Sequence, residues 1–274
     1  MTRIATLFAL LVTLPQAIAH AEPDGEASLS WQLRPVTLGN FVRIDGAAAA
    51  FNDRNGNVDI AVASTLGASY QLSRAWASVL RLGLVGNNAP GAALDGSSFA
   101  NPLLGATHVR RMGDYRLGVF AGATLPIGTG NSRTHAAAGT ARPADRAMFD
   151  VDDVAGIAGV DVAYCKWGFT AQGEATIVQS VRVRGDEGER LATRAAVGVH
   201  LGYLVGWHIA VGGDLHYEDT LTAALGVRLQ FRVGAHSWIR PGVALLRGFG
   251  ERGLDAPLLN AHTTAVMVDL PMTF

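Results

Sequence analysis

Residues 221–233 read LTAALGVRLQFRV, and every second residue of this stretch is apolar. The intervening positions include Thr222, Arg228, Gln230 and Arg232. Alternation with a period of two is typical of a β-strand that has one face in an apolar environment. The run is much longer than the ~5–6 residues of a usual strand in a globular protein, and it is long enough for a tilted membrane strand of ~9–11 residues.

The same alternation recurs along the chain, most clearly in residues 191–203 and 207–218. Short turn-like segments and longer polar connections separate the runs, as in bacterial outer-membrane barrels, which use an even number of strands. The pattern therefore predicts an all-β fold, an antiparallel transmembrane β-barrel of about twelve strands. The predicted strand centres lie near Val42, Val62, Leu82, Leu104, Val119, Gly159, Gly173, Val197, Val211, Val227, Val243 and Val266.

The C-terminal residues alternate in the same way and end on an aromatic side chain. Leu270, Met272 and Phe274 share one face of the last predicted strand. This ending resembles the C-terminal signal of bacterial outer-membrane β-barrels, which implies that the barrel-assembly machinery is a partner. We expect this strand to close the barrel and these three residues to form the assembly signal.

The N-terminal residues are typical of a secretory signal peptide. Arg3 precedes an apolar run over residues 4–14, and small residues at 19 and 21 form a cleavage pattern. We therefore expect a signal peptide over residues 1–21 and an outer-membrane barrel over residues 22–274.

Composition narrows the functional classes. The 274-residue chain has 16% charged residues, a net charge of −1 and one cysteine. A nearly neutral chain lacks the strongly basic footprint of a nucleic-acid-binding domain, so we expect no nucleic-acid partner. A single cysteine excludes an intramolecular disulfide scaffold and a four-cysteine zinc site. No cofactor and no metal are predicted.

A family resemblance is carried by residues 101–130. Residues 101–105 read NPLLG, a Gly113-Asp114 turn follows, and residues 117–128 read LGVFAGATLPIG. This stretch resembles the barrels named for the meta pathway of phenol degradation, although Ile127 stands where that family would have Thr. The resemblance implies a membrane barrel with a transport role.

If the apolar faces contact lipid, the opposite faces line the interior. Arginine is the commonest charged type among these residues, which favours anions or organic acids in a narrow aqueous path. The alternative is that the charges pair across strands and fill the barrel. The predicted pore-lining residues are Arg43, Asp45, Asp59, Arg81, His108, Arg110, Arg116, Asp161, Glu174, Arg182, Arg184, Arg194, His200, His208, Asp214, His216, Glu218, Arg228, Arg232 and Arg240.

Two segments allow more than one interpretation. Asp214, His216 and Glu218 share one strand face and could form half of a metal site, but an interior ion network is the preferred interpretation. Residues 129–146 are predicted to form the longest exposed loop, the alternative being a loop that folds inward and narrows the pore.

The sequence thus predicts a passive outer-membrane channel of a Gram-negative bacterium, with outer-membrane lipid and small, anionic or aromatic solutes as partners. A closed structural or adhesive barrel is the first alternative. A lipid hydrolase using His262 and Thr264 is a weaker alternative, because no Ser nucleophile elbow accompanies them, and the protein is not expected to be an enzyme. A soluble barrel with an apolar interior is the weakest.

Overall fold

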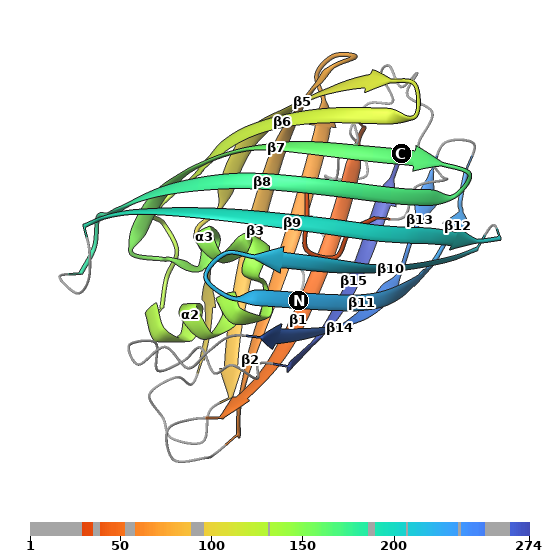
Figure 1. The fold of residues 1–274 in the computed structure, drawn as a ribbon. Helices are drawn as coiled ribbons and strands as arrows, with labels where there is room; N and C mark the ends of the chain where they lie inside the picture. The colour runs from red at the N-terminus through yellow and green to blue at the C-terminus, as the bar shows by residue number, and fades with distance from the viewer. Residues whose placement is uncertain are drawn as a thin grey trace.

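The computed structural model describes residues 29–34, 39–52, 58–88, 96–130, 132–185, 190–206, 208–234, 237–249 and 264–274. Within these ranges the chain forms one antiparallel barrel of twelve long strands (Figure 1). Each predicted strand centre lies inside one of them, so the predicted fold is confirmed. The long strands are β1 (Phe41–Asn52), β2 (Val58–Gln71), β3 (Trp76–Asn88), β5 (Leu103–Met112), β6 (Tyr115–Thr124), β7 (Asp153–Lys166), β8 (Phe169–Arg182), β9 (Leu191–Val205), β10 (Ile209–Tyr217), β11 (Leu221–Leu229), β14 (Gly242–Phe249) and β15 (Thr264–Thr273).

The remaining elements are short. Strand β4 (Gly96–Phe99) pairs with β3, while β12 (Phe231–Arg232) and β13 (Trp238–Ile239) continue the β11 and β14 hairpin. The helical elements are α2 (Ser132–Ala141), η1 (Pro143–Asp145) and α3 (Arg146–Phe149). None of the helices in the described residues is both long and apolar enough to cross a membrane.

The last strand closes the barrel. Strand β15 pairs with β14 on one side and with β1 on the other, from Phe41 opposite Thr273 to Ala50 opposite Thr264. Within the described ranges each long strand therefore pairs with a neighbour on both sides, which is the requirement for β-structure in an apolar medium.

Side chains alternate between two faces, as the sequence predicts. On β11, Leu225 points outward and is 73% exposed, whereas Arg228 points inward and is only 2% exposed. The outer face carries a continuous band of Leu, Val, Ile and aromatic residues, and the inner face carries most of the buried charge. This inside-out distribution is that of a membrane barrel and is opposite to that of a soluble barrel with an apolar interior.

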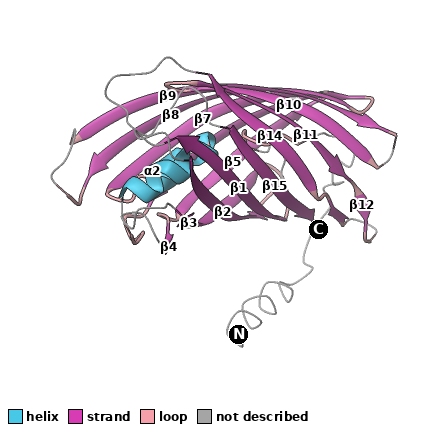
Figure 2. Cartoon of the chain, turned by 90° about the horizontal axis from the view of Figure 1, so that it is seen from below, coloured by secondary structure: helices cyan, strands magenta, loops and turns pink. Residues whose placement is uncertain are grey.

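The two ends of the barrel differ in their connections. Tight turns at 72–75, 113–114 and 167–168 define the short-turn end, where Gly113 and Gly168 adopt positive φ angles of 62° and 78°. The connection over residues 125–152, which holds α2, η1 and α3, starts and ends at the opposite end, here called the long-connection end. Figure 2 shows α2 lying within the curve of the strands.

The expectation of an exposed loop over residues 129–146 is therefore wrong. Ala138 and Ala141 of α2 are fully buried, and the helix packs against β1, β2 and β3 from inside the barrel. Farther along, Met148 and Phe149 are buried against Leu103 and neighbouring apolar residues. The small alanine side chains allow close approach to the wall, and α3 supplies the apolar anchor. We call residues 128–152 the inward loop.

Candidate functional site: the interior of the barrel

A short N-terminal segment, residues 29–34, lies across the middle of the lumen. One carboxylate oxygen of Asp214 on β10, Oδ2, accepts hydrogen bonds from Ser30 Oγ at 3.0 Å, Trp31 N at 2.7 Å and Gln32 N at 2.8 Å. The other oxygen, Oδ1, lies 2.5 Å from Nδ1 of His200 on β9. Three donors on a carboxylate that is only 2% exposed make a strong anchor for the segment.

Two arginines hold the same segment from the side of the barrel seam. Arg43 on β1 donates to the carbonyl oxygens of Ser30 and Trp31, each at 3.2 Å. Arg228 on β11 donates to the carbonyl oxygen of Leu29 and lies over the Trp31 ring. Both guanidinium groups also pair with Asp269 on β15, at 3.0 and 2.7 Å. The segment is thus attached to strands on both sides of the seam.

Arg34 ends the N-terminal segment and reaches the opposite wall. Its Nη1 lies 2.6 Å from Glu174 Oε1 and 3.1 Å from Thr176 Oγ1, both on β8. Its backbone N donates to Glu174 Oε2 at 2.8 Å, and its carbonyl oxygen accepts from Gln172 Nε2 at 2.6 Å. Its guanidinium carbon lies 3.8 Å from the centre of the Phe120 ring.

The inward loop is held by a second cluster of charges. Asp145 of η1 pairs with Arg81 on β3 and, at 2.6 Å, with Arg142. Arg142 in turn lies 3.4 Å from Asp45 on β1. Burial alone would raise the pKa of Asp145, but the positive charges of Arg81 and Arg142 outweigh it and hold that pKa well below its usual range. These groups therefore remain ionised and tie the loop to the wall.

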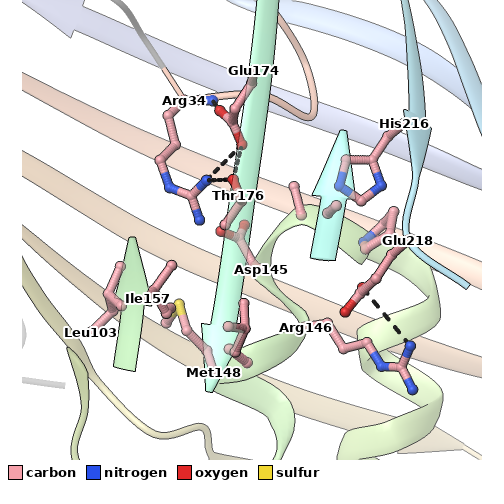
Figure 3. A pocket seen from close by; sticks show the side chains of 15 residues that line it. Arg34, Leu103, Asp145, Arg146, Met148, Ile157, Glu174, Thr176, His216 and Glu218 are labelled. Carbon is pink, nitrogen blue, oxygen red and sulfur yellow. Dashed lines mark hydrogen bonds and ion pairs between the residues drawn. The ribbon is translucent and has the colours of Figure 1, made fainter. Parts of the chain in front are cut away.

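Among the described residues, two cavities lie beside these segments. The loop-side cavity lies between η1, α3 and strands β8–β10, and Figure 3 shows Arg34, Glu174, Arg146 and Glu218 around it. The turn-side cavity extends towards the start of β1 at Phe41. Both cavities share Arg34, Leu103 and Ile157 as lining residues. Arg34 therefore stands where the two volumes meet.

Most of the predicted lining residues point inward, but they occupy different environments. The ends of the barrel hold the exposed members Arg184, His208 and Arg232. Asp59 lies outside the residues whose side chains are described. The buried members are Arg43, Asp45, Arg116, Asp161, Glu174, His200, Asp214, His216, Arg228 and Arg240, and the half-buried members are Arg81, Arg182, Arg194 and Glu218.

The inward assignment of Arg110 and His108 is wrong. On β5 the buried residues Leu103 and Val109 mark the inner face, so the even-numbered residues point outward. His108 packs edge-on against Trp76, which is itself exposed. The sequence gives no clear face for this strand because identical residues are adjacent at both of its ends, Leu103-Leu104 and Arg110-Arg111. Each pair places one residue on each face, so apolar and charged residues do not alternate.

Several residues of the site were not predicted. Ser30, Arg34, Arg142 and Asp145 lie in segments without alternation, so no periodic signal marks them. Asp269 lies on the inward face of β15, and its alternation with the outward apolar residues Val266, Val268 and Leu270 could have identified it.

The possible metal half-site is divided between different partners. Asp214 binds the N-terminal segment and His200, whereas Glu218 pairs with Arg194 at 3.3 Å. His216 lines the loop-side cavity. Among the described residues, no group of three or more His, Cys, Asp or Glu side chains is arranged to hold a metal ion. Of the proposed hydrolase pair, Thr264 lies at the start of β15, and His262 is outside the described residues.

The strand that carries the predicted assembly signal occupies the closing position. Leu270 and Met272 lie on β15 opposite Ile44 and Val42 of β1, and the backbone N of Phe274 donates to Asn40 O at 3.1 Å. Recognition of these residues by the barrel-assembly machinery stays a prediction.

Comparison with known proteins identifies structural neighbours only. No family model matches the chain, and no curated protein matches it, so the likeness of residues 101–130 to the meta-pathway barrels stays a resemblance. An outer membrane channel from Pseudomonas putida F1 is similar, with a TM-score of 0.55 and 14% identity over 90% of this chain and 99% of that chain. The NanC porin has a TM-score of 0.51 and 6% identity over 85% and 98%. A KdgM porin in complex with disordered oligogalacturonate has a TM-score of 0.50 and 8% identity over 85% and 99%. At these identities the likeness concerns the fold.

Proposed function

We propose that this protein is an outer-membrane channel that passes small solutes by diffusion through the two interior cavities. The apolar outer band and the charged interior support a position in the outer membrane of a Gram-negative bacterium, with residues 1–21 as the export signal. Structural neighbours named as a porin or an outer membrane channel favour the same interpretation.

The observation that carries the proposal is the arrangement of the cavities. One opens beside the inward loop, the other extends towards the short-turn end, and both are lined by Arg34. A solute crossing the barrel would occupy one cavity, pass the Arg34 side chain and enter the other. Because Arg34 is held by Glu174, Thr176 and Phe120, this passage requires the side chain to move or the solute to displace it.

The solute class follows from how the interior charges are partnered. The arginine excess does not support a preference for anions, because interior arginines are ion-paired with carboxylates and leave little free positive charge. The paired arginines are Arg43, Arg81, Arg142, Arg194 and Arg228. An apolar or aromatic body is supported instead, because the turn-side cavity is bounded by aromatic and aliphatic side chains. These are Phe41, Val79, Leu103, Phe120 and Ile157.

A closed structural or adhesive barrel is the second candidate. The specific observation in its favour is that residues 29–34 and the inward loop both occupy the lumen and are anchored by buried ion pairs and charge-assisted hydrogen bonds. In that case the loops at the long-connection end would carry the function.

Conductance in planar lipid bilayers separates the two candidates. We expect small discrete openings for the purified, refolded protein, and a larger conductance for Arg34→Ala, because this change joins the two cavities. Arg190→Ala, at an exposed position beside β9, is the matched control and should conduct like the unchanged protein. If folded Arg34→Ala conducts no ions, the channel proposal is rejected in favour of the closed barrel.

A further inference from the structure

One buried carboxylate faces the turn-side cavity without a complete set of partners. Asp161 on β7 is only 4% exposed and lines this cavity. Its Oδ1 atom is buried and accepts no hydrogen bond from any described residue. A buried carboxylate oxygen without a donor is costly, so its position next to an open volume indicates a place for a donor from a ligand.

The charges around the turn-side cavity leave Asp161 without a counterion. Arg34 is paired with Glu174 at 2.6 Å, and Glu174 lies directly opposite Asp161 in the β7–β8 ladder. Arg81 is paired with Asp145 and lies 3.7 Å from Asp45. Both cations that line the cavity therefore have carboxylate partners, whereas Asp161 forms no ion pair within the described part of the chain. Asp161 and Glu174 therefore face each other across the β7–β8 ladder, and Arg34 is paired with Glu174.

The remaining wall of this cavity suits an apolar body next to a positive charge. The Phe120 ring already accepts a cation, because the Arg34 guanidinium carbon lies 3.8 Å from its centre. The ring is fixed in place by close packing on Gly159, where an added Cβ would lie 2.4 Å from a ring carbon. Arg34 already occupies this ring, so Phe120 contributes apolar surface to the cavity together with Phe41 and Leu103.

We propose that the turn-side cavity is a binding site for small organic cations that carry an ammonium group on an aromatic or aliphatic body. The ammonium group donates to Asp161 Oδ1, and the body lies against Phe41, Phe120 and Leu103. The inference deepens the proposed channel function, on which it rests, by naming the solute class that pauses on this side of Arg34.

The test is isothermal titration of the full mature protein in detergent micelles with three probes of similar size. The probes are the phenylethylammonium ion, 2-phenylethanol and phenylacetate, each corrected by titration into detergent alone. We expect the ammonium ion to bind at least about tenfold more tightly than the alcohol, because a charge-assisted hydrogen bond is stronger than a neutral one. Phenylacetate should show no binding, because its carboxylate has no hydrogen-bond donor for Asp161.

Variants of Asp161 test whether its carboxylate binds the ammonium group. Asp161→Asn should weaken phenylethylammonium binding by about tenfold or more, whereas Asp161→Glu should retain most of it. Asp114→Asn, which removes a carboxylate at an exposed turn, should leave binding unchanged. Because Asp161→Asn could impair folding, each variant is first checked for the heat-dependent electrophoretic mobility of a folded barrel, and Phe120→Leu provides a second variant that should weaken binding while keeping the carboxylate.

The outcomes separate this inference from the channel proposal. Equal binding of 2-phenylethanol, tighter binding of phenylacetate, or unchanged binding in folded Asp161→Asn would each overturn the organic-cation site. Bilayer conductance without ammonium binding would leave the channel and reject the site. Ammonium binding without conductance would leave the site in a closed barrel and reject the channel.

Discussion

The guanidinium carbon of Arg228 lies 3.5 Å from the centre of the Trp31 ring, and this contact joins the penultimate hairpin of the barrel to its N-terminal segment. Trp31 is almost completely buried, although it belongs to a segment that contributes no strand. The stacked pair lies beside Asp214 and Asp269, so the segment is held by an aromatic contact, charge-assisted hydrogen bonds and ion-paired arginines together.

Removal of the Asp214 charge should release the N-terminal segment. In Asp214→Asn, three hydrogen bonds to a charged acceptor become weaker bonds to a neutral one; a hydrogen bond to a charged group contributes about 1.5–3 kcal/mol. We expect a larger bilayer conductance and a red-shifted Trp31 emission, isolated by comparison with the same variants carrying Trp31→Phe. Asp114→Asn, which removes a carboxylate at an exposed turn, is the control. Unchanged emission in folded Asp214→Asn would contradict this account of the anchor.

The ion cluster of the inward loop should show energetic coupling. Arg142→Met leaves Asp45 and Asp145 with one cation fewer, and Asp145→Asn leaves Arg142 and Arg81 with one anion fewer. Loss of one partner of a buried pair costs about 3–5 kcal/mol, and residues of one network couple by about 0.5–3 kcal/mol. We expect each single variant to unfold at lower urea and the double variant to lose less than the sum. Additive effects would show that the two residues act independently.

Docking of α2 should weaken in acid. Burial lowers the pKa of His135, with Arg184 acting in the same direction and Asp152 and the Thr129 carbonyl opposing it. A lowered pKa in the docked state means that the stabilisation is present above the ordinary value of 6.5 and is lost as the pH falls through the lowered value. Between about pH 7.5 and about pH 5, amide exchange of Ser132–Ala141 should therefore accelerate beyond the intrinsic rate change.

Protonation of Asp145 does not account for a loss of α2 docking over this pH range, because its lowered pKa keeps it charged at these pH values. His135→Gln should therefore remove the pH response of α2 while the loop stays docked. If the exchange rates of His135→Gln still respond to pH as in the unchanged protein, another group controls the docking.

Substitution of Gly159 should disturb the wall of the turn-side cavity. A Cβ at this position would lie 2.4 Å from the Phe120 ring and 2.6 Å from the Ala175 carbonyl oxygen, so neighbours must move. Gly159→Ala is expected to cost about 1–3 kcal/mol, the usual penalty for overpacking. Gly86→Ala, at a strand position with open space for a Cβ, should be close to neutral. Urea unfolding of both variants provides the measurement, and equal midpoints would argue against tight packing at Gly159.

The barrel itself could be predicted because each strand has one apolar face that points outward. Runs such as residues 221–233 must alternate, and twelve of them with a final strand ending at an aromatic residue leave few other folds. The prediction failed on β5, where Arg110 and Arg111 are adjacent and only one of them can face inward. Local ambiguity of this kind is resolved by the register with β3, which places His108 opposite Trp76.

The interior segments could not be predicted for a different physical reason. Residues 29–34 and the inward loop are positioned by contacts with distant strands, such as Arg34 with Glu174 and Asp145 with Arg81. These contacts impose no period on the sequence. The alanine-rich composition of α2 resembles that of an exposed loop because small residues suit both close packing and solvent.

The contact between β1 and β15 has a consequence for how the chain chooses its final pairing during assembly. Arg43 and Asp269 come from the first and last strands, and they meet at 3.0 Å only in the observed register. A slip by one residue between these strands would turn one of the two charges towards the apolar exterior, and a slip by two would separate them along the lumen. The ion pair therefore favours the observed register, because a misaligned barrel leaves a charge without its partner in an apolar environment.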